Sequence, residues 1–232
     1  MIGDGEQEGR LEWISTHWPG IREPEAFVMR YGRAMRAYLG AILRDPHEAE
    51  EAMQDFLLRV VQHRFERVSE EGGRFRDYLK RSIHNAAVSQ LRKRKAGGAP
   101  PIDVEAVASP ARPAEADEAW RREWRRCVLE GAWRALEQHE RNSPGNLFHT
   151  AITLVTQHPD EDSAALAGRA GALRGSPIGA IAFRKQLSRA RSFLAERIVA
   201  EVSQGLQDPS RESLEEELAE LGLLQLVKPH LT

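Results

Sequence analysis

Apolar side chains in the first half of the chain recur at steps of three and four residues, which predicts amphipathic helices. The clearest series lies between residues 26 and 43. Its members would fall on one side of a helix, so we expect that side to face a core. The apolar residues of this stretch are Phe27, Tyr31, Ala34, Met35, Tyr38, Leu39 and Ile42.

Two further helices are expected in this half. Asp45 can cap the start of the first one, because its side chain can accept hydrogen bonds from exposed backbone N–H groups. Pro46 then suits the first helical position, since its missing N–H would have no partner there. Gly72 and Gly73 interrupt the helical pattern, and a third helix is predicted from about residue 76 to residue 95.

The second half is predicted to be helical as well. Tryptophan and aliphatic side chains keep helical spacing from Trp120 to Leu136. No strand-length run of alternating β-branched residues competes with this interpretation. The expected fold class is therefore all-α. Further helices are predicted at residues 147–157, 163–170, 179–202 and 211–221.

Glycine and proline gather between the two halves. Residues 96–101 read AGGAPP, and Pro110 and Pro113 follow, with weak apolar periodicity. This composition is typical of an exposed, flexible linker. We therefore predict two helical domains, the second of which contains a helix-turn-helix and ends in an acidic amphipathic extension. The predicted boundaries are residues 1–95, a linker at 96–116, and residues 117–232.

Composition narrows the function classes. The chain has 232 residues, of which 41% are hydrophobic, so it can bury a sizeable core. Cys127 is the single cysteine, which excludes a disulfide framework and a cysteine-rich metal site. No apolar run approaches the length that spans a bilayer, and the polar, acidic start does not resemble a signal peptide. We expect a cytoplasmic protein without membrane insertion, metal or cofactor.

The charges are separated along the chain, although the net charge is only −2. Acidic residues gather at positions 45–55 and 212–220, and basic residues gather at 74–95 and 184–197. A general polyanion binder would be basic throughout. This arrangement instead predicts two separate anion-binding patches and other faces for different partners.

The most informative pattern lies in the last third. A short helix at residues 163–170, a turn at 173–177 and a longer helix predict the arrangement that places a second helix in a DNA major groove. Phe183 and Leu187 would face the core. A solvated basic face without a ligand is the alternative interpretation. The exposed side of the second helix would carry Arg184, Lys185, Ser188 and Arg191, with Arg189 near its edge.

The first half contains two charged segments of opposite sign. Residues 73–95 combine basic groups with Phe75 and Tyr78. Basic groups can hold a nucleic-acid backbone while an aromatic ring receives an unstacked base; both rings could equally belong to the core. Residues 48–57 read EAEEAMQDFL, and this acidic helix suits a basic protein partner or serves solubility alone.

These three segments, in this order, resemble the extracytoplasmic-function (ECF) sigma factors of the sigma-70 family. Residues 48–57 resemble the family's polymerase-binding helix. Residues 75–85 with Arg92, Lys93 and Arg94 resemble the helix that melts and reads the −10 element, and residues 187–194 resemble the end of the −35 recognition helix. The resemblance runs from about residue 26 to residue 194, and a linker between the two domains belongs to the family pattern.

The resemblance implies a transcription initiation factor that binds core RNA polymerase and promoter DNA, with an anti-sigma factor or other regulator as a further partner. Residues 120–136 would form the frame that docks the second domain on the polymerase flap. The implied polymerase contacts are Glu50, Glu51, Gln54, Asp55 and Leu57. The implied −10 contacts are Arg74, Arg76, Tyr78, Lys80, Arg81, Asn85, Arg92 and Lys93. The implied −35 contacts are Ile181, Ala182, Arg184, Lys185, Ser188, Arg189 and Arg191.

The sequence departs from the family pattern in two places. Ala167, Gly168 and Arg169 stand where an acidic residue is frequent. The chain also continues through residues 204–232, where leucines are accompanied by an acidic face, as in an amphipathic helix. This extension is expected either to pack on the second domain or to dock a regulator.

Other functions explain less of the sequence. A conventional helix-turn-helix regulator, which acts without polymerase, gives no reason for the basic residues 74–95. A protein-interaction module leaves the basic recognition helix unexplained. An enzyme is not expected, and no catalytic residue is assigned: the segment from His47 to Glu51 lacks the second histidine of a zinc-protease helix, and Cys127 has no catalytic neighbours in sequence.

Overall fold

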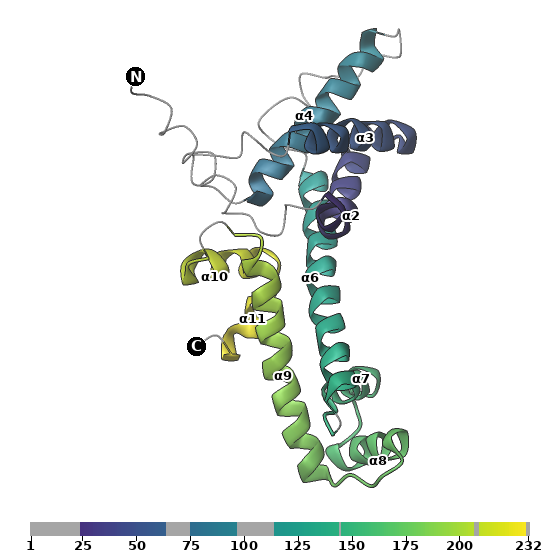
Figure 1. Cartoon of the computed structure of the whole chain (residues 1–232), viewed down its shortest axis with the longest axis vertical. Coiled ribbons are helices and arrows are strands. Elements are labelled where there is room, and N and C mark those ends of the chain that lie inside the picture. Colours follow the sequence, from purple (N-terminus) through teal and green to yellow (C-terminus); the bar gives the residue numbers. More distant parts are fainter. Residues whose placement is uncertain (1–23, 64–74, 97–113, 144, 207–208, 231–232) are drawn as a thin grey trace, which may run out of the picture. The chain divides into compact units, whose positions relative to one another are not determined.

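The structure is a computed structural model, and it describes residues 24–63, 75–96, 114–143, 145–206 and 209–230. Every regular element in these ranges is a helix (Figure 1), which confirms the all-α prediction. The helices are α2 (Pro24–Leu43), α3 (Pro46–His63), α4 (Phe75–Ala96), α6 (Ala114–Asn142), α7 (Phe148–Gln157), α8 (Ser163–Arg174), α9 (Ala180–Ser203), α10 (Arg211–Glu220), α11 (Leu224–Val227) and the 3₁₀ turn η2 (Lys228–His230).

The chain divides into two compact units. Unit 1 comprises Met1–Cys127 and Gln204–Ser213, and unit 2 comprises Val128–Ser203 and Leu214–Thr232. The division therefore falls within α6, which contributes its first turns to unit 1 and its later turns to unit 2.

The core of unit 1 forms where α2, α3 and α4 pack together. The predicted stripe of α2 is buried throughout, from Phe27 to Ile42. The turn between α2 and α3 depends on Asp45, whose Oδ1 accepts hydrogen bonds from the backbone N–H groups of His47 at 2.8 Å and Glu48 at 3.1 Å. These bonds lower the pKa of the Asp45 carboxyl, and the hydrogen bond from the Glu48 N–H group contributes most. The predicted cap is therefore present.

The first turns of α6 also belong to unit 1. The Trp120 ring lies edge-on to Tyr38, with centroids 6.3 Å apart, and the Trp124 ring stacks on Tyr31 at 4.9 Å. All four rings are buried. The expected boundary at residue 117 placed both tryptophans in the second domain, and the structure differs here. A glycine- and proline-rich segment marks a break in the chain, but the core that the next helix joins depends on tertiary packing.

Unit 2 contains a core formed by α7, α8 and α9, and Figure 1 shows α7 and α8 beside the first turns of α9. Asp162 caps α8 by accepting hydrogen bonds from Ala164 N at 3.0 Å and Ala165 N at 2.8 Å. The helix ends at Gly175, which has a left-handed φ of 71° that favours glycine. The buried residues of this core are Ala151, Leu154, Leu166, Ala167, Ala170 and Phe183, with Val155, Ile178 and Leu187 packed against them.

The C-terminal extension packs on the second half of α9. Within unit 2, α11 and η2 contact α9, where Ala195, Ile198 and Val202 are buried. Leu218, Leu221, Leu223 and Val227 of the extension are buried as well. Of the two alternatives for this segment, the structure therefore supports packing on the second domain.

Candidate nucleic-acid and polymerase interfaces

In unit 2, α8, a turn at residues 175–179 and α9 follow one another in the order that was predicted for a helix-turn-helix. The turn is tight at Gly171, where an added Cβ would lie 3.0 Å from the backbone oxygen of Ser176. Any larger residue would have to push the turn away from α8. The side chain of Gln186 in α9 also donates a hydrogen bond to the backbone oxygen of Gly145 at 3.1 Å. These contacts fix the start of α9 relative to α7 and α8.

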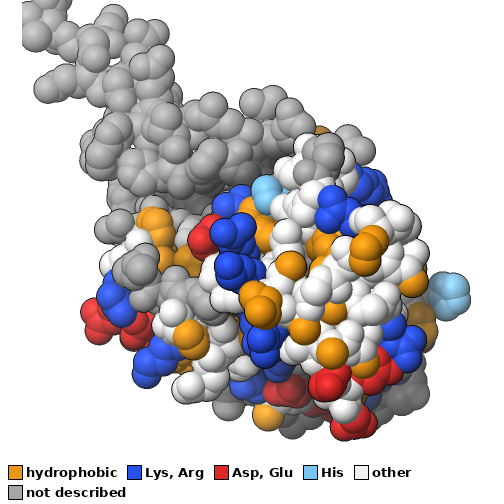
Figure 2. Space-filling view, turned by 90° about the horizontal axis from the view of Figure 1, so that it is seen from below, with side chains coloured by type: hydrophobic (Ala, Val, Ile, Leu, Met, Phe, Trp, Pro, Cys, Tyr) orange, Lys and Arg blue, Asp and Glu red, His pale blue; other side chains and the backbone are white. Residues whose placement is uncertain are grey.

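One side of α9 packs inward and the other faces solvent. Phe183 and Ala190 are buried in unit 2. Figure 2 views the face that carries α8 and the start of α9, and Lys and Arg side chains gather there beside uncharged and apolar ones. The structure thus leaves accessible every residue that was predicted to face the −35 element. The exposed residues are Ile181, Ala182, Arg184, Lys185, Ser188, Arg189 and Arg191.

The departure from the family pattern in α8 has a structural explanation. Ala167 is buried in the three-helix core, whereas Gly168 and Arg169 are exposed. Arg169 donates a hydrogen bond through Nε to Glu161 Oε2 at 2.7 Å. This bond lowers the pKa of the Glu161 carboxyl and raises that of the Arg169 guanidinium. Arg169 therefore connects α8 to Glu161 in the segment that precedes the helix.

The residues of α4 that were predicted to contact the −10 element fall into two groups. Arg81, Asn85, Arg92 and Lys93 are exposed, and Tyr78 is half-buried. Arg76 and Lys80 have only 5% and 4% of their surface exposed, which differs from the expectation that they face DNA. Arg74 lies outside the described residues.

The burial of Lys80 coincides with a contact from α6. Its Nζ donates a hydrogen bond to Asp117 Oδ1 at 2.7 Å, and the two groups form an ion pair. Arg76 lies one helical turn before Lys80, and its Nε is 3.7 Å from Asp77 Oδ1. A buried ammonium requires such a partner, because an uncompensated charge out of water is costly. This side of α4 is therefore occupied by protein in unit 1.

The predicted polymerase contacts of α3 also fall into two groups. Glu50, Glu51 and Gln54 are exposed, whereas Asp55 and Leu57 are half-buried. The exposed face that carries Glu50 and Gln54 continues along α3 with Leu58 and Val61, which are 57% and 56% exposed. Sequence reasoning did not include these two residues. Their spacing from Gln54, at steps of four and seven, is the signal that could have identified them.

Three acidic residues of α3 hold the C-terminal half of α4. Glu48 pairs with Arg94 at 3.3 Å, and Glu51 Oε2 accepts a hydrogen bond from Gln90 at 2.9 Å. Asp55 pairs with Lys93 at 2.7 Å. The predicted polymerase contacts Glu51 and Asp55 therefore also connect α3 to α4.

The pair of Asp55 and Lys93 perturbs both groups. The hydrogen bond from Lys93 lowers the pKa of the Asp55 carboxyl below its ordinary 3.8. The same bond raises the pKa of the Lys93 ammonium above its ordinary 10.5. Both side chains are roughly half exposed, so solvent screens their attraction and the pair contributes little to stability.

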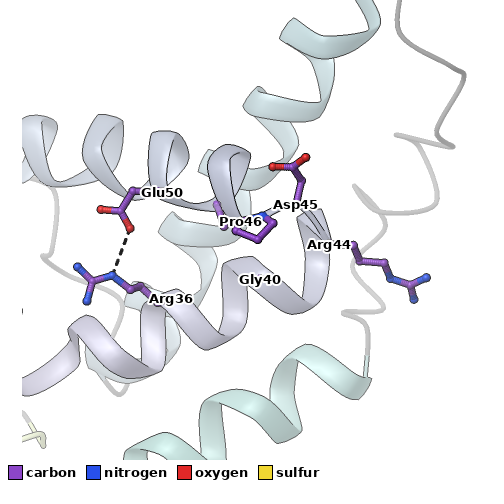
Figure 3. A pocket seen from close by; sticks show the side chains of 7 residues that line it. Arg36, Gly40, Arg44, Asp45, Pro46 and Glu50 are labelled. Carbon is purple, nitrogen blue, oxygen red and sulfur yellow. Dashed lines mark hydrogen bonds and ion pairs between the residues drawn. The ribbon is translucent and has the colours of Figure 1, made fainter.

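A shallow pocket of about 400 Å³ lies between α2 and α3 (Figure 3). Arg36 of α2 and Glu50 of α3 point toward one another there, with Nε and Oε2 3.3 Å apart, while Arg44 points away. Arg44 pairs instead with Glu115 of α6 at 3.6 Å. Within the pocket, Arg36 and Glu50 therefore pair with each other, and Glu50 places the pocket beside the acidic face of α3. The remaining lining residues are Gly40, Asp45, Pro46 and Ala49.

Within the described ranges, no group of His, Cys, Asp and Glu side chains is arranged to hold a metal ion. None of the helices in those ranges combines the length and the apolar character needed to cross a bilayer.

Comparison with known proteins bears on unit 1. Residues 27–97 match the family model of sigma-70 region 2. The match spans nearly all of α2 and the whole of α3 and α4, and so includes both the acidic face and the basic helix. It supports a place in the sigma-70 family and a sigma-factor role in polymerase binding and promoter melting. Searches of curated proteins and of solved structures returned no match to the chain.

Proposed function

We propose that the chain is a sigma factor of the ECF type, which binds core RNA polymerase and directs promoter recognition and DNA melting. The observation that carries the proposal is the match of residues 27–97 to sigma-70 region 2. A helix-turn-helix with an exposed basic face follows it in the chain, in the order that the proposal requires. Such a factor acts in the cytoplasm, where the bacterial chromosome lies, and an anti-sigma factor that covers a DNA surface is a further proposed partner.

The polymerase contact is assigned to the exposed stripe of α3. Glu50, Glu51 and Gln54 supply polar groups at one end of the helix, and Leu58 and Val61 supply apolar surface at the other. Negative charge beside exposed apolar side chains suits a partner surface that is basic and partly apolar. A coiled coil of the polymerase large subunit, presenting basic residues along an amphipathic face, would have this chemistry.

The DNA contacts are assigned to both basic helices. The exposed cations of α9 would hold the backbone and read base edges of the −35 element in the major groove. In α4, the exposed residues Arg81, Asn85 and Arg92 would engage the −10 strand, with Tyr78 beside them. Stacking and hydrogen bonds from this surface would offset the free energy of extruding a base from the duplex.

The test is a pull-down of bacterial core RNA polymerase by the full chain. The variants Gln54→Arg and Leu58→Ala alter the stripe without removing the ion pairs between α3 and α4. Each is expected to weaken polymerase binding about tenfold or more. Gln138→Arg, which makes the same change at an exposed position of α6, serves as the matched control and should bind normally. Folded wild-type protein that fails to bind polymerase would contradict the proposal.

A conventional helix-turn-helix regulator is the second candidate. The observation that favours it is the contrast between α9, whose predicted DNA residues are all exposed, and α4, where Arg76 and Lys80 are buried. A regulator of this kind would bind a specific DNA site through unit 2 alone. Sequence-specific binding that core polymerase neither strengthens nor alters would favour this second function.

A further inference from the structure

An isoleucine is exposed at the start of the second helix of the helix-turn-helix. Ile181 is the second residue of α9, and 66% of its surface is accessible. Leu173, near the end of α8, is 73% exposed on the other side of the same turn. Single exposed apolar side chains are common on protein surfaces, so the role of Ile181 depends on its neighbours on the helix rather than on its exposure alone.

Ile181 shares its side of the helix with the basic residues. Arg184, Lys185 and Ser188 follow it at steps of three, four and seven residues, and side chains at these spacings are neighbours on a helix surface. All of them are exposed, while Phe183 turns into the core. The isoleucine therefore belongs to the surface that would meet DNA.

The chemistry of the groove identifies what Ile181 would contact. In a helix-turn-helix, the N-terminal residues of the second helix reach the base edges of the major groove. The 5-methyl group of thymine is the apolar group that those edges present. We infer that Ile181 is a specificity-determining residue that recognises a thymine methyl group in the −35 element. The inference rests on the proposed function, since it requires that α9 enters duplex DNA.

The neighbouring arginine narrows the expected sequence. Arg184 lies three residues further along α9, about 4.5 Å along the helix axis. Successive base pairs are about 3.4 Å apart. If Arg184 reads a guanine through its O6 and N7 atoms, the thymine that contacts Ile181 lies about one or two base pairs from that guanine. Ala182 is small enough to let the backbone of this turn approach the bases.

The experiment starts from a random-sequence DNA duplex library, from which the full chain, alone and bound to core polymerase, selects its preferred sites. Each thymine of a recovered site is then replaced by deoxyuridine, which keeps the base pair and removes only the methyl group. For the wild type, one such replacement should weaken binding about fourfold, the effect of exposing one buried methyl group.

The variants show whether Ile181 makes that contact. Ile181→Ala should bind the thymine and deoxyuridine duplexes equally well. Leu173→Ala removes a similarly exposed apolar side chain that lies on α8, outside the basic face of α9, and it should keep the fourfold difference. Thermal unfolding of the variants checks that the fold is retained; Ile181→Val, which keeps a β-branched side chain, should retain most of the difference.

Three results would overturn the inference. Wild-type binding could be insensitive to every replacement, or Ile181→Ala could remain as sensitive as the wild type. Ile181→Ala could also weaken polymerase binding while leaving DNA selection unchanged, which would make Ile181 a protein contact. These results are distinguishable from failure of the proposed function, in which no sequence is selected and Arg184→Ala has no effect on DNA binding. That failure would remove the inference as well.

Discussion

The two basic helices of this chain present their charges in different ways. In α9, the residues predicted to face DNA are all exposed, and the apolar side rests on α7 and α8. In α4, Lys80 is buried against Asp117 and Lys93 is paired with Asp55. Helices of similar composition thus differ in what they can bind without rearrangement. The difference lies in what packs beside each helix rather than in the helix itself.

The contrast limits how α4 can meet DNA. Contact through Lys80 requires separation from Asp117, which is carried by the same turns of α6 that bury Trp120 and Trp124. Contact through Arg81, Asn85 and Arg92 requires no such change, because these side chains are exposed. Substitutions that change these contacts one at a time test the difference between α4 and α9.

The largest effect is expected for Trp120→Ala. The ring is fully buried beside Tyr38, so its removal should lower the free energy of unfolding of unit 1 by about 3–5 kcal/mol. Denaturant titration measures the change. Trp133→Ala, which removes a half-buried tryptophan from unit 2, should cost less. Equal costs for the two variants would show that the start of α6 is not part of the core of unit 1.

A smaller loss is expected for Asp117→Ala, which leaves the Lys80 ammonium buried without its carboxylate. Because Asp117 is itself partly exposed, we expect a loss of about 2–3 kcal/mol in the free energy of unfolding. The double variant Asp117→Ala with Lys80→Met should recover most of it, since no buried charge remains. Denaturant titration of the two single variants and the double variant gives the coupling. Additive losses would contradict a direct pair.

The two helices should differ in DNA binding as well. Arg184→Ala in α9 should weaken binding to a selected duplex by about 5- to 150-fold, the range for an arginine that reads a base. Lys80→Met in α4 should leave the affinity of the free chain unchanged, because that side chain is already buried. Fluorescence anisotropy at several salt concentrations measures both. A matching loss for Lys80→Met would mean that DNA displaces α6 readily.

The smallest effect concerns the exposed pair of Asp55 and Lys93. Because pairing lowers the pKa of Asp55, its contribution to stability is present above pH 3.8 and is lost as the pH falls further, through the folded-state value. Because pairing raises the pKa of Lys93, the contribution of this group to stability is present below pH 10.5 and is lost as the pH rises further, through the folded-state value. Asp55→Asn should therefore be slightly less stable than the wild type at neutral pH and equal to it in strong acid. Thermal unfolding across pH measures this difference, and Asp160→Asn serves as the control.

Helical periodicity predicted the all-α class and the exposed face of α9, and the capping preference of aspartate predicted the cap at Asp45. Each of these features depends on residues close together in sequence. Burial of Lys80 could not be predicted in this way, since its partner Asp117 lies 37 residues along the chain. The packing of Trp120 against Tyr38 could not be predicted either, because these residues are also far apart in sequence. Leu58 and Val61 were not predicted, although they lie at helical spacing from Gln54 and on the same exposed face as the acidic residues.

Transcription in vitro tests most directly the proposal that this chain directs polymerase to promoters. Core RNA polymerase would transcribe a library of bacterial genomic fragments with and without the chain, and the 5′ ends of the transcripts would be mapped. A sigma factor should create new start sites that share upstream sequence and that disappear with Gln54→Arg or Arg184→Ala. The same set of start sites with and without the folded chain would contradict it.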